Sequence, residues 1–235
     1  MAGDKILVLG GTGLAGVCLI RELLHRQHGT VVFARNPAKL PEEFVSNKLL
    51  EVVKGEMTDK TALSNAISKC HTIISFLGPV NIRQPASTEY ADYYRAIFPL
   101  MRQHGVRRIF AMATLSIYAP EDKGSVTRAI FVTMVRLLAS GPYHNLLSIR
   151  EPFEDKKITQ DIDWTLFRIG SITGGSDLGS WKQDREQTDV YAGPLGGAGW
   201  TSAQKRASLT RWLVDASETG ASEWIGRMPA VSRRA

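Results

Sequence analysis

The stretch that decides the fold is Lys5-Ile-Leu-Val-Leu-Gly-Gly-Thr-Gly-Leu-Ala-Gly16. Its first five residues form a short apolar run that is typical of a buried strand. Glycines then follow at positions 10, 13 and 16, and apolar residues recur at helical spacing over residues 14–24. A strand, a glycine turn and a helix in this order predict the first half of a βαβ unit.

The rest of the 235-residue chain alternates between short β-rich runs and amphipathic stretches. Further strands are predicted at 30–34, 50–54, 72–77, 107–113 and 163–169, and helices at 58–69 and 90–104. Strands that alternate with helices need crossover connections, so we predict an α/β fold of the Rossmann type with a doubly wound, mostly parallel sheet. No break in composition marks a linker, and we expect one NAD(P)-binding domain over residues 1–235.

The composition argues against several other classes of protein. Two cysteines cannot make a disulfide framework, and no Cys/His cluster suggests a metal site. No run approaches the roughly 18 apolar residues of a membrane span, and no signal-peptide pattern opens the chain. We therefore expect a cytoplasmic protein with no membrane partner. The formal charge of +6 comes from scattered residues without a basic–aromatic platform, so we also expect no nucleic-acid partner.

The glycine turn has the spacing of a dinucleotide-binding motif. Gly10 permits a tight turn, Gly13 lets the backbone approach a pyrophosphate, and Gly16 lets the helix pack closely on the strand. The helix that begins near Leu14 offers unpaired N–H groups to the phosphates, and Thr12 lies within the same turn. A glycine-rich turn without a ligand is the alternative, but the flanking strand and helix favour dinucleotide binding.

The residues after the second strand predict which dinucleotide binds. An NAD site usually has an acidic residue about 20 residues beyond the glycines, where it binds the ribose hydroxyls. This chain has Ala34-Arg-Asn-Pro37 there instead. Arg35 can pair with a 2′-phosphate through two hydrogen bonds, supported by Asn36 or Lys39, so NADP(H) is the predicted cofactor. A solvated Arg35 on the surface is the alternative.

Residues at the ends of four other strands complete the predicted cofactor site. A carboxylate after the third strand can reach the adenine amino group, and a glycine after the fourth lets the chain pass close to the cofactor. Backbone after the sixth strand can hold the nicotinamide amide. These candidates are Glu56, Met57, Leu77, Gly78, Thr114, Ile169, Gly170 and Ser171.

Five stretches resemble the atypical short-chain dehydrogenase/reductases, in particular the NmrA-like and biliverdin-reductase-B-like NAD(P)H-binding proteins. They are residues 10–16, 34–37, 55–59, 163–168 and 224–229, and the last resembles the tails of fungal oxidoreductases of secondary metabolism. The resemblance implies an NADPH-binding Rossmann domain with a substrate-side loop region over residues 174–199. It implies no single reaction, because members include reductases, redox-sensing regulators and proteins that keep the cofactor without net redox change.

The sequence lacks the usual catalytic pair of this enzyme class. Typical short-chain dehydrogenases place Tyr and Lys four residues apart, so that the ammonium lowers the tyrosine pKa. None of the six tyrosines here has a lysine four residues later. We expect Thr114 or Ser116 to hydrogen-bond a substrate carbonyl and Tyr118 to donate the proton. In the alternative, Thr114 and Ser116 only satisfy backbone groups at the strand end.

A lysine before the sixth strand is a further catalytic candidate, because some relatives have an active-site lysine there. Lys157 occupies this place, and an exposed ion pair with Glu154 is the alternative.

The expected substrate-side features are apolar. Residues 126–138 are apolar on more than one helical face, which predicts a core helix, a homodimer face or a wall for an aromatic ligand. Trp181, Tyr191 and Trp200 either cap a planar substrate or anchor the packing of their segments.

These observations favour an NADPH-dependent oxidoreductase that transfers hydride to a carbonyl, enone or quinone of a small aromatic or polyketide-like substrate. One alternative is a non-redox isomerase or cyclase that retains the cofactor. Another is an NADP-binding regulator of the NmrA-like type.

Overall fold

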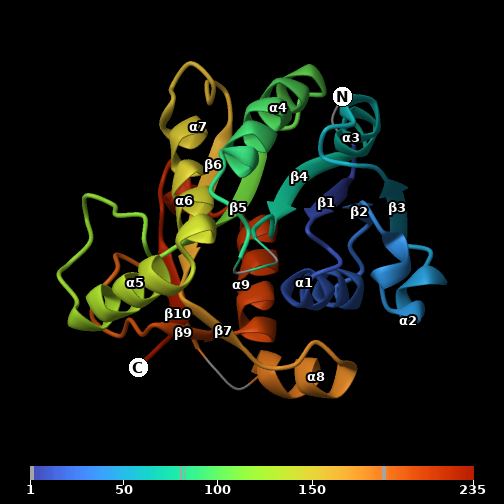
Figure 1. Cartoon of the computed structure of the whole chain (residues 1–235). Coiled ribbons are helices and arrows are strands. Elements are labelled where there is room, and N and C mark those ends of the chain that lie inside the picture. Colours follow the sequence, from blue (N-terminus) through green and yellow to red (C-terminus); the bar gives the residue numbers. More distant parts are fainter. Residues whose placement is uncertain (1–2, 80, 82, 187–188) are drawn as a thin grey trace.

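A computed structural model describes residues 3–79, 81, 83–186 and 189–235. Its main sheet has the strand order β3-β2-β1-β4-β5-β6-β10-β8 (Figure 1). Its strands are β1 (Lys5–Leu9), β2 (Thr30–Ala34), β3 (Leu50–Lys54), β4 (Cys70–Ser75), β5 (Arg108–Thr114), β6 (Asp163–Ile169), β8 (Val190–Gly193) and β10 (Ala230–Arg233). Neighbouring strands are parallel except β8, which is antiparallel to β10. The predicted Rossmann-type fold is confirmed.

Helices cover both faces of this sheet (Figure 1). One face carries α1 (Leu14–His25), α2 (Glu42–Val45) and α9 (Arg206–Thr219), with α8 (Leu178–Glu186) packed against α1 and α9. The other face carries α3 (Lys60–Ile67), α4 (Glu89–Gln103), α6 (Ser140–Ser148) and α7 (Arg150–Glu154). A second, two-stranded parallel sheet pairs β7 (Ser171–Thr173) with β9 (Ala203–Lys205). Two short 3₁₀ turns lie at Pro37–Lys39 and Ser222–Trp224.

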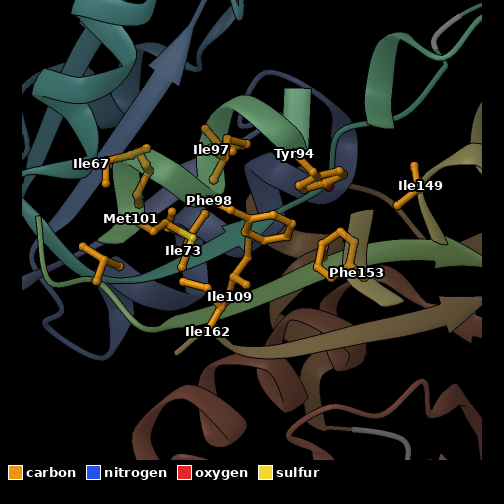
Figure 2. Packing of buried hydrophobic residues seen from close by; sticks show 14 of the residues in the cluster. Ile67, Ile73, Tyr94, Ile97, Phe98, Met101, Ile109, Ile149, Phe153 and Ile162 are labelled. Carbon is orange, nitrogen blue, oxygen red and sulfur yellow. The ribbon is translucent and has the colours of Figure 1, made fainter. Parts of the chain in front are cut away.

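Aromatic side chains fill the core on the α4 side of the sheet. Tyr94 and Phe98 of α4 contact Phe153 of α7, with ring centroids 4.8 Å and 5.0 Å from it. These rings lie over Ile73 of β4 and Ile109 of β5 (Figure 2). Burying each such side chain stabilises the fold by roughly 1.5–3 kcal/mol. This cluster therefore fixes the two central strands whose ends lead to the site.

The segment 174–199 is more ordered than the predicted loop, because it contains α8 and β8. The ring of Trp181 is buried against Cys18 of α1 and Ala207 of α9. The hydroxyl of Tyr191 donates to the carbonyl of Pro194 at 2.7 Å, and Trp200 packs beside a buried apolar cluster. All three rings are packing anchors in this conformation.

Helix α5 (Val126–Leu138) is not a core helix. It lies to one side of the main sheet, next to α6 (Figure 1). Wherever the structure describes its side chains, none is buried. No helix among the described residues is long and apolar enough to cross a membrane.

Candidate cofactor and active site

The glycine turn after β1 has the geometry that dinucleotide phosphates need. Gly10 has φ +76°, and a Cβ there would lie 2.8 Å from the carbonyl oxygen of Phe76. A Cβ on Gly16 would lie 2.3 Å from the carbonyl oxygen of Gly10, so only glycine lets α1 pack this closely on the turn. Larger residues at either position would push the helix away from the strand.

The N-terminus of α1 is open to an anion. Gly13 precedes the first helical residue, Leu14, and both are exposed. The first turn carries no acidic residue, and among the described residues no side chain caps this end. Its unpaired N–H groups and the positive end of the helix dipole therefore fit a pyrophosphate.

The carboxyl ends of four strands meet around this turn. Leu9 of β1 pairs with Ser75 of β4, and the amide of Phe76 donates to the carbonyl of Leu9 at 2.9 Å. A Cβ on Gly78 would lie 2.9 Å from the Met112 side chain of β5.

The ends of β5 and β6 lie side by side further along this edge. Thr114 of β5 pairs with Ile169 of β6. A Cβ on Gly170 would lie 2.7 Å from the Leu115 side chain. The structure thus brings the predicted segments at 10–16, 77–78, 114 and 169–171 to one edge, which is where doubly wound sheets bind nucleotides.

The predicted 2′-phosphate site lies at the end of β2. Arg35 is exposed directly after the strand, and in the described part of the chain its guanidinium makes no hydrogen bond or ion pair. Asn36 and Lys39 are also exposed: Asn36 precedes a short 3₁₀ turn, and Lys39 is the last residue of that turn. Glu56, the predicted adenine contact, is exposed beyond the adjacent β3. Met57 is half-buried beside it.

The hydroxyl groups after β5 are held locally. The Thr114 hydroxyl accepts from the backbone N–H of Ser116 at 3.3 Å and lies 3.4 Å from the Ser116 hydroxyl. Thr114 thus satisfies a backbone group, as the structural alternative predicts, while it occupies the edge where a carbonyl substrate would bind. The Tyr118 hydroxyl donates to the carbonyl of Asp122 at 3.0 Å, so its proton is engaged in this conformation.

Lys157 does not lie at this edge. Strand β6 begins at Asp163, which pairs with Arg108, the first residue of β5. The turn that carries Lys157 therefore lies at the amino edge of the sheet, opposite the glycine turn. The sequence-based assignment of Lys157 to the site is corrected on this ground. The expected ion pair with Glu154 is also absent among the described residues, because Glu154 pairs with Arg150 at 2.7 Å.

A buried ion pair behind the β5 loop escaped the sequence analysis. Arg168 of β6 donates to the Asp122 carboxylate with both terminal nitrogens, one of them at 2.7 Å. The same guanidinium donates to the carbonyls of Met228 and Ile117 at 2.6 Å and 2.9 Å. Burial opposes the ionisation of Asp122, but the Arg168 hydrogen bonds outweigh it and hold the pKa of this carboxyl below its usual range. A charged residue between the apolar Phe167 and Ile169 near the end of the strand was the available signal.

The loop after β4 is anchored by another residue that the sequence did not reveal. Asn145 of α6 is fully buried. Its amide nitrogen donates to the carbonyl of Pro85 at 3.1 Å, and its oxygen accepts from the backbone N–H of Ser87. A lone Asn outside every predicted element gives no sign of such a role, because isolated polar residues are usually solvated.

This geometry defines a dinucleotide-binding Rossmann protein, and sequence comparison supplies the family. The chain belongs to the NAD(P)H-binding family, whose sequence profile matches residues 10–216. It is 33% identical over 91 residues to the 3 beta-hydroxysteroid dehydrogenase/Delta 5→4-isomerase of Mycobacterium tuberculosis. That match covers 39% of this chain and only 23% of the mycobacterial enzyme.

Solved structures share the whole fold at low sequence identity. A short-chain dehydrogenase/reductase from Veillonella parvula superimposes with a TM-score of 0.72 at 15% identity, covering 99% of this chain and 94% of that one. A Veillonella parvula structure in complex with NADP gives 0.70 at 14% identity, covering 97% and 94%. The anaerobillin reductase ChuY from Escherichia coli O157:H7 gives 0.70 at 12% identity, covering 97% and 96%. The predicted membership of the NAD(P)H-binding family is confirmed, and the solved structures confirm the fold.

Proposed function

We propose that this chain is an NADPH-dependent oxidoreductase acting on a carbonyl, enone or quinone of a small aromatic or polyketide-like substrate. One observation carries the proposal: the open N-terminus of α1 and the unpaired Arg35, within the described residues, lie at the carboxyl ends of adjacent strands. A dinucleotide that spans these two positions puts its pyrophosphate on the helix and its 2′-phosphate on the arginine.

The nicotinamide end would lie over the exits of β5 and β6. Bound NADPH supplies the hydride. The backbone at Gly170 and Ser171 would hold the carboxamide and so fix which ring face meets the substrate. Thr114 and Ser116, at the exit of β5, would orient the substrate oxygen.

Orientation and exclusion of water would carry most of the rate enhancement. The sequence has no tyrosine–lysine pair to supply a proton. The Tyr118 hydroxyl must leave the Asp122 carbonyl before it can donate, so Thr114, Ser116 or a water is the better-placed proton source.

Two measurements test the proposal. Titration of the protein with NADPH and NADH should show tighter binding of NADPH, since only NADPH carries the 2′-phosphate. Substrate-dependent loss of reduced-nicotinamide absorbance should then follow with a panel of quinones and enones. Tight NADPH binding without turnover across the panel would overturn the assignment as an oxidoreductase.

A second candidate function is an NADP-binding regulator, and the exposure of α5 favours it. A regulator that docks on a partner needs an unpartnered apolar surface, which α5 has within the described chain. A regulator binds NADP(H) without consuming it, so the turnover assay separates the two candidates.

A further inference from the structure

Helix α5 presents a continuous apolar face to solvent. Side chains recur along it at spacings of four, four and three residues, which places them on one side of a helix. They are Val126, Ile130, Met134 and Leu137, with exposed fractions of 78%, 63%, 49% and 77%, and Leu138 extends the face. A shallow apolar groove is lined by four of these side chains, Ile130, Met134, Leu137 and Leu138. Such a face on a 13-residue helix needs a partner.

The surroundings of this face are positively charged. Residues 123–150 contain four cationic side chains and no Asp or Glu. Two of them are engaged within the chain, because Arg150 pairs with Glu154 and Arg128 donates to backbone carbonyls. Lys123 is exposed just before α5, and Arg136 is exposed in its last turn. Arg83 is also exposed, and the neighbouring Gln84 backbone lies against Gly141 in the first turn of α6. Positive charge thus flanks the apolar face at both ends.

These features fit a second copy of the chain poorly. A symmetric pairing of two α5 helices would bring together two segments that carry only positive charge. A 13-residue helix is about 20 Å long and about 10 Å wide. One such face falls well short of the roughly 800 Å² per partner of a stable protein interface.

We propose that α5 is a membrane-surface helix that binds bilayers with anionic headgroups. An apolar face with flanking Lys and Arg is the pattern of helices that lie in the interfacial plane. Ile130, Met134 and Leu137 would enter the acyl-chain boundary, while Lys123 and Arg136 would pair with the headgroups. The expectation of no membrane partner rested on the lack of a spanning segment. A surface helix needs no span.

Arg128 connects this helix to the candidate active site. Its Nε donates to the carbonyl of Leu115 at 2.9 Å and a terminal nitrogen donates to that of Ser116 at 3.2 Å. Docking of α5 would therefore hold the loop after Thr114 beside the bilayer, where an apolar quinone or enone dissolves. The delivery of an apolar substrate to this loop rests on the proposed function. The binding of α5 to the bilayer does not, since it requires no turnover.

Vesicle co-sedimentation of the full chain tests the proposal. Binding should be stronger to phosphatidylcholine–phosphatidylserine vesicles than to phosphatidylcholine alone, and should weaken as salt rises. Leu137→Glu should weaken binding at least about tenfold, because it places a carboxylate on the helix face that would enter the bilayer. Arg136→Gln should weaken it about fivefold at low salt. Val45→Glu is the matched control, because Val45 is 75% exposed on α2, and it should bind as the unmodified chain does.

Three results would overturn the proposal. They are no binding to anionic vesicles at low salt, equal losses with Leu137→Glu and Val45→Glu, and a dimer in sedimentation equilibrium that Leu137→Glu dissociates. Leu137 is exposed, so circular dichroism and thermal melting should show that the variant is folded. NADPH titration of the same samples shows separately whether the proposed cofactor site survives.

Discussion

Asp122 and Arg168 form a fully buried ion pair that joins the loop after β5 to strand β6. The Asp122 carboxylate also accepts from the backbone N–H groups of Ala119 and Leu195, each at 2.8 Å. One carboxylate therefore holds three segments, and the segment it closes starts at Thr114. The pair determines where the candidate hydroxyl groups lie relative to the sheet edge.

Removing the carboxylate should cost much of the folding free energy. In Asp122→Ala the Arg168 guanidinium stays buried without its counter-charge, and we expect a loss of about 3–5 kcal/mol. Urea unfolding at neutral pH measures this loss. Glu121→Ala is the control, because Glu121 is the exposed neighbour and its removal should change stability by less than about 0.5 kcal/mol. Equal effects of the two variants would show that the pair does not hold the loop.

The same pair predicts a pH dependence of stability. The folded-state pKa of Asp122 is lowered, so its stabilisation is present above the unfolded pKa of about 3.9 and disappears as the pH falls through the folded pKa. The difference in unfolding free energy between the unmodified chain and Asp122→Asn should be constant above about pH 5. It should shrink below about pH 4. Urea titrations over this range test the sign, and a difference that grows on acidification would contradict it.

The glycine turn predicts a steric effect on cofactor binding. Gly16→Ala puts a methyl group 2.3 Å from the carbonyl oxygen of Gly10, so α1 must move away from the turn. We expect NADPH affinity to fall at least about tenfold, about 1.4 kcal/mol, as measured by calorimetric titration. In the control Gly124→Ala the new methyl group meets nothing within 4 Å. NADPH affinity unchanged in both variants would place the phosphates elsewhere.

Arg35 predicts the choice between the two nicotinamide cofactors. Arg35→Ala removes a charge-assisted pair with the 2′-phosphate, which should weaken NADPH binding about tenfold to a hundredfold. NADH binding should stay nearly the same, because NADH carries only a neutral 2′-hydroxyl at that position and offers the arginine no charge to pair with. Arg107→Ala is the matched control, since Arg107 is exposed beside β5 at the opposite edge of the sheet. A parallel loss of NADPH and NADH affinity would mean that Arg35 stabilises the fold rather than selects the cofactor.

Much of the fold follows from the sequence, because buried parallel strands appear as short apolar runs. The predicted strands at 5–9, 30–34, 50–54 and 163–169 coincide with β1, β2, β3 and β6. The glycine spacing likewise predicted the turn after β1, since no other residue fits so close to the backbone. Both the strands and the turn are determined by residues close together in the sequence, which is why the sequence alone predicts them.

Three features of the site and surface could not be predicted, because they depend on contacts between residues far apart in the sequence. The pairing of Arg168 with Asp122 joins residues 46 positions apart, and no local pattern encodes it. Lys157 precedes a predicted strand, but only the sheet shows that this end is opposite the glycine turn. The apolar helix at 126–138 was compatible with a core position, and only the packing shows that it is exposed.

Hydride transfer is tested most directly with NADPH that carries deuterium at the reactive C4 position. Incubation with an enone or ketone substrate, in which hydride is delivered to carbon and the label cannot exchange with water, followed by mass spectrometry, measures where the label goes. The proposed function predicts carbon-bound deuterium in the product in proportion to the NADPH consumed, with a single configuration at the labelled carbon. Product that forms without deuterium and without loss of NADPH would contradict it and identify a non-redox enzyme that retains its cofactor.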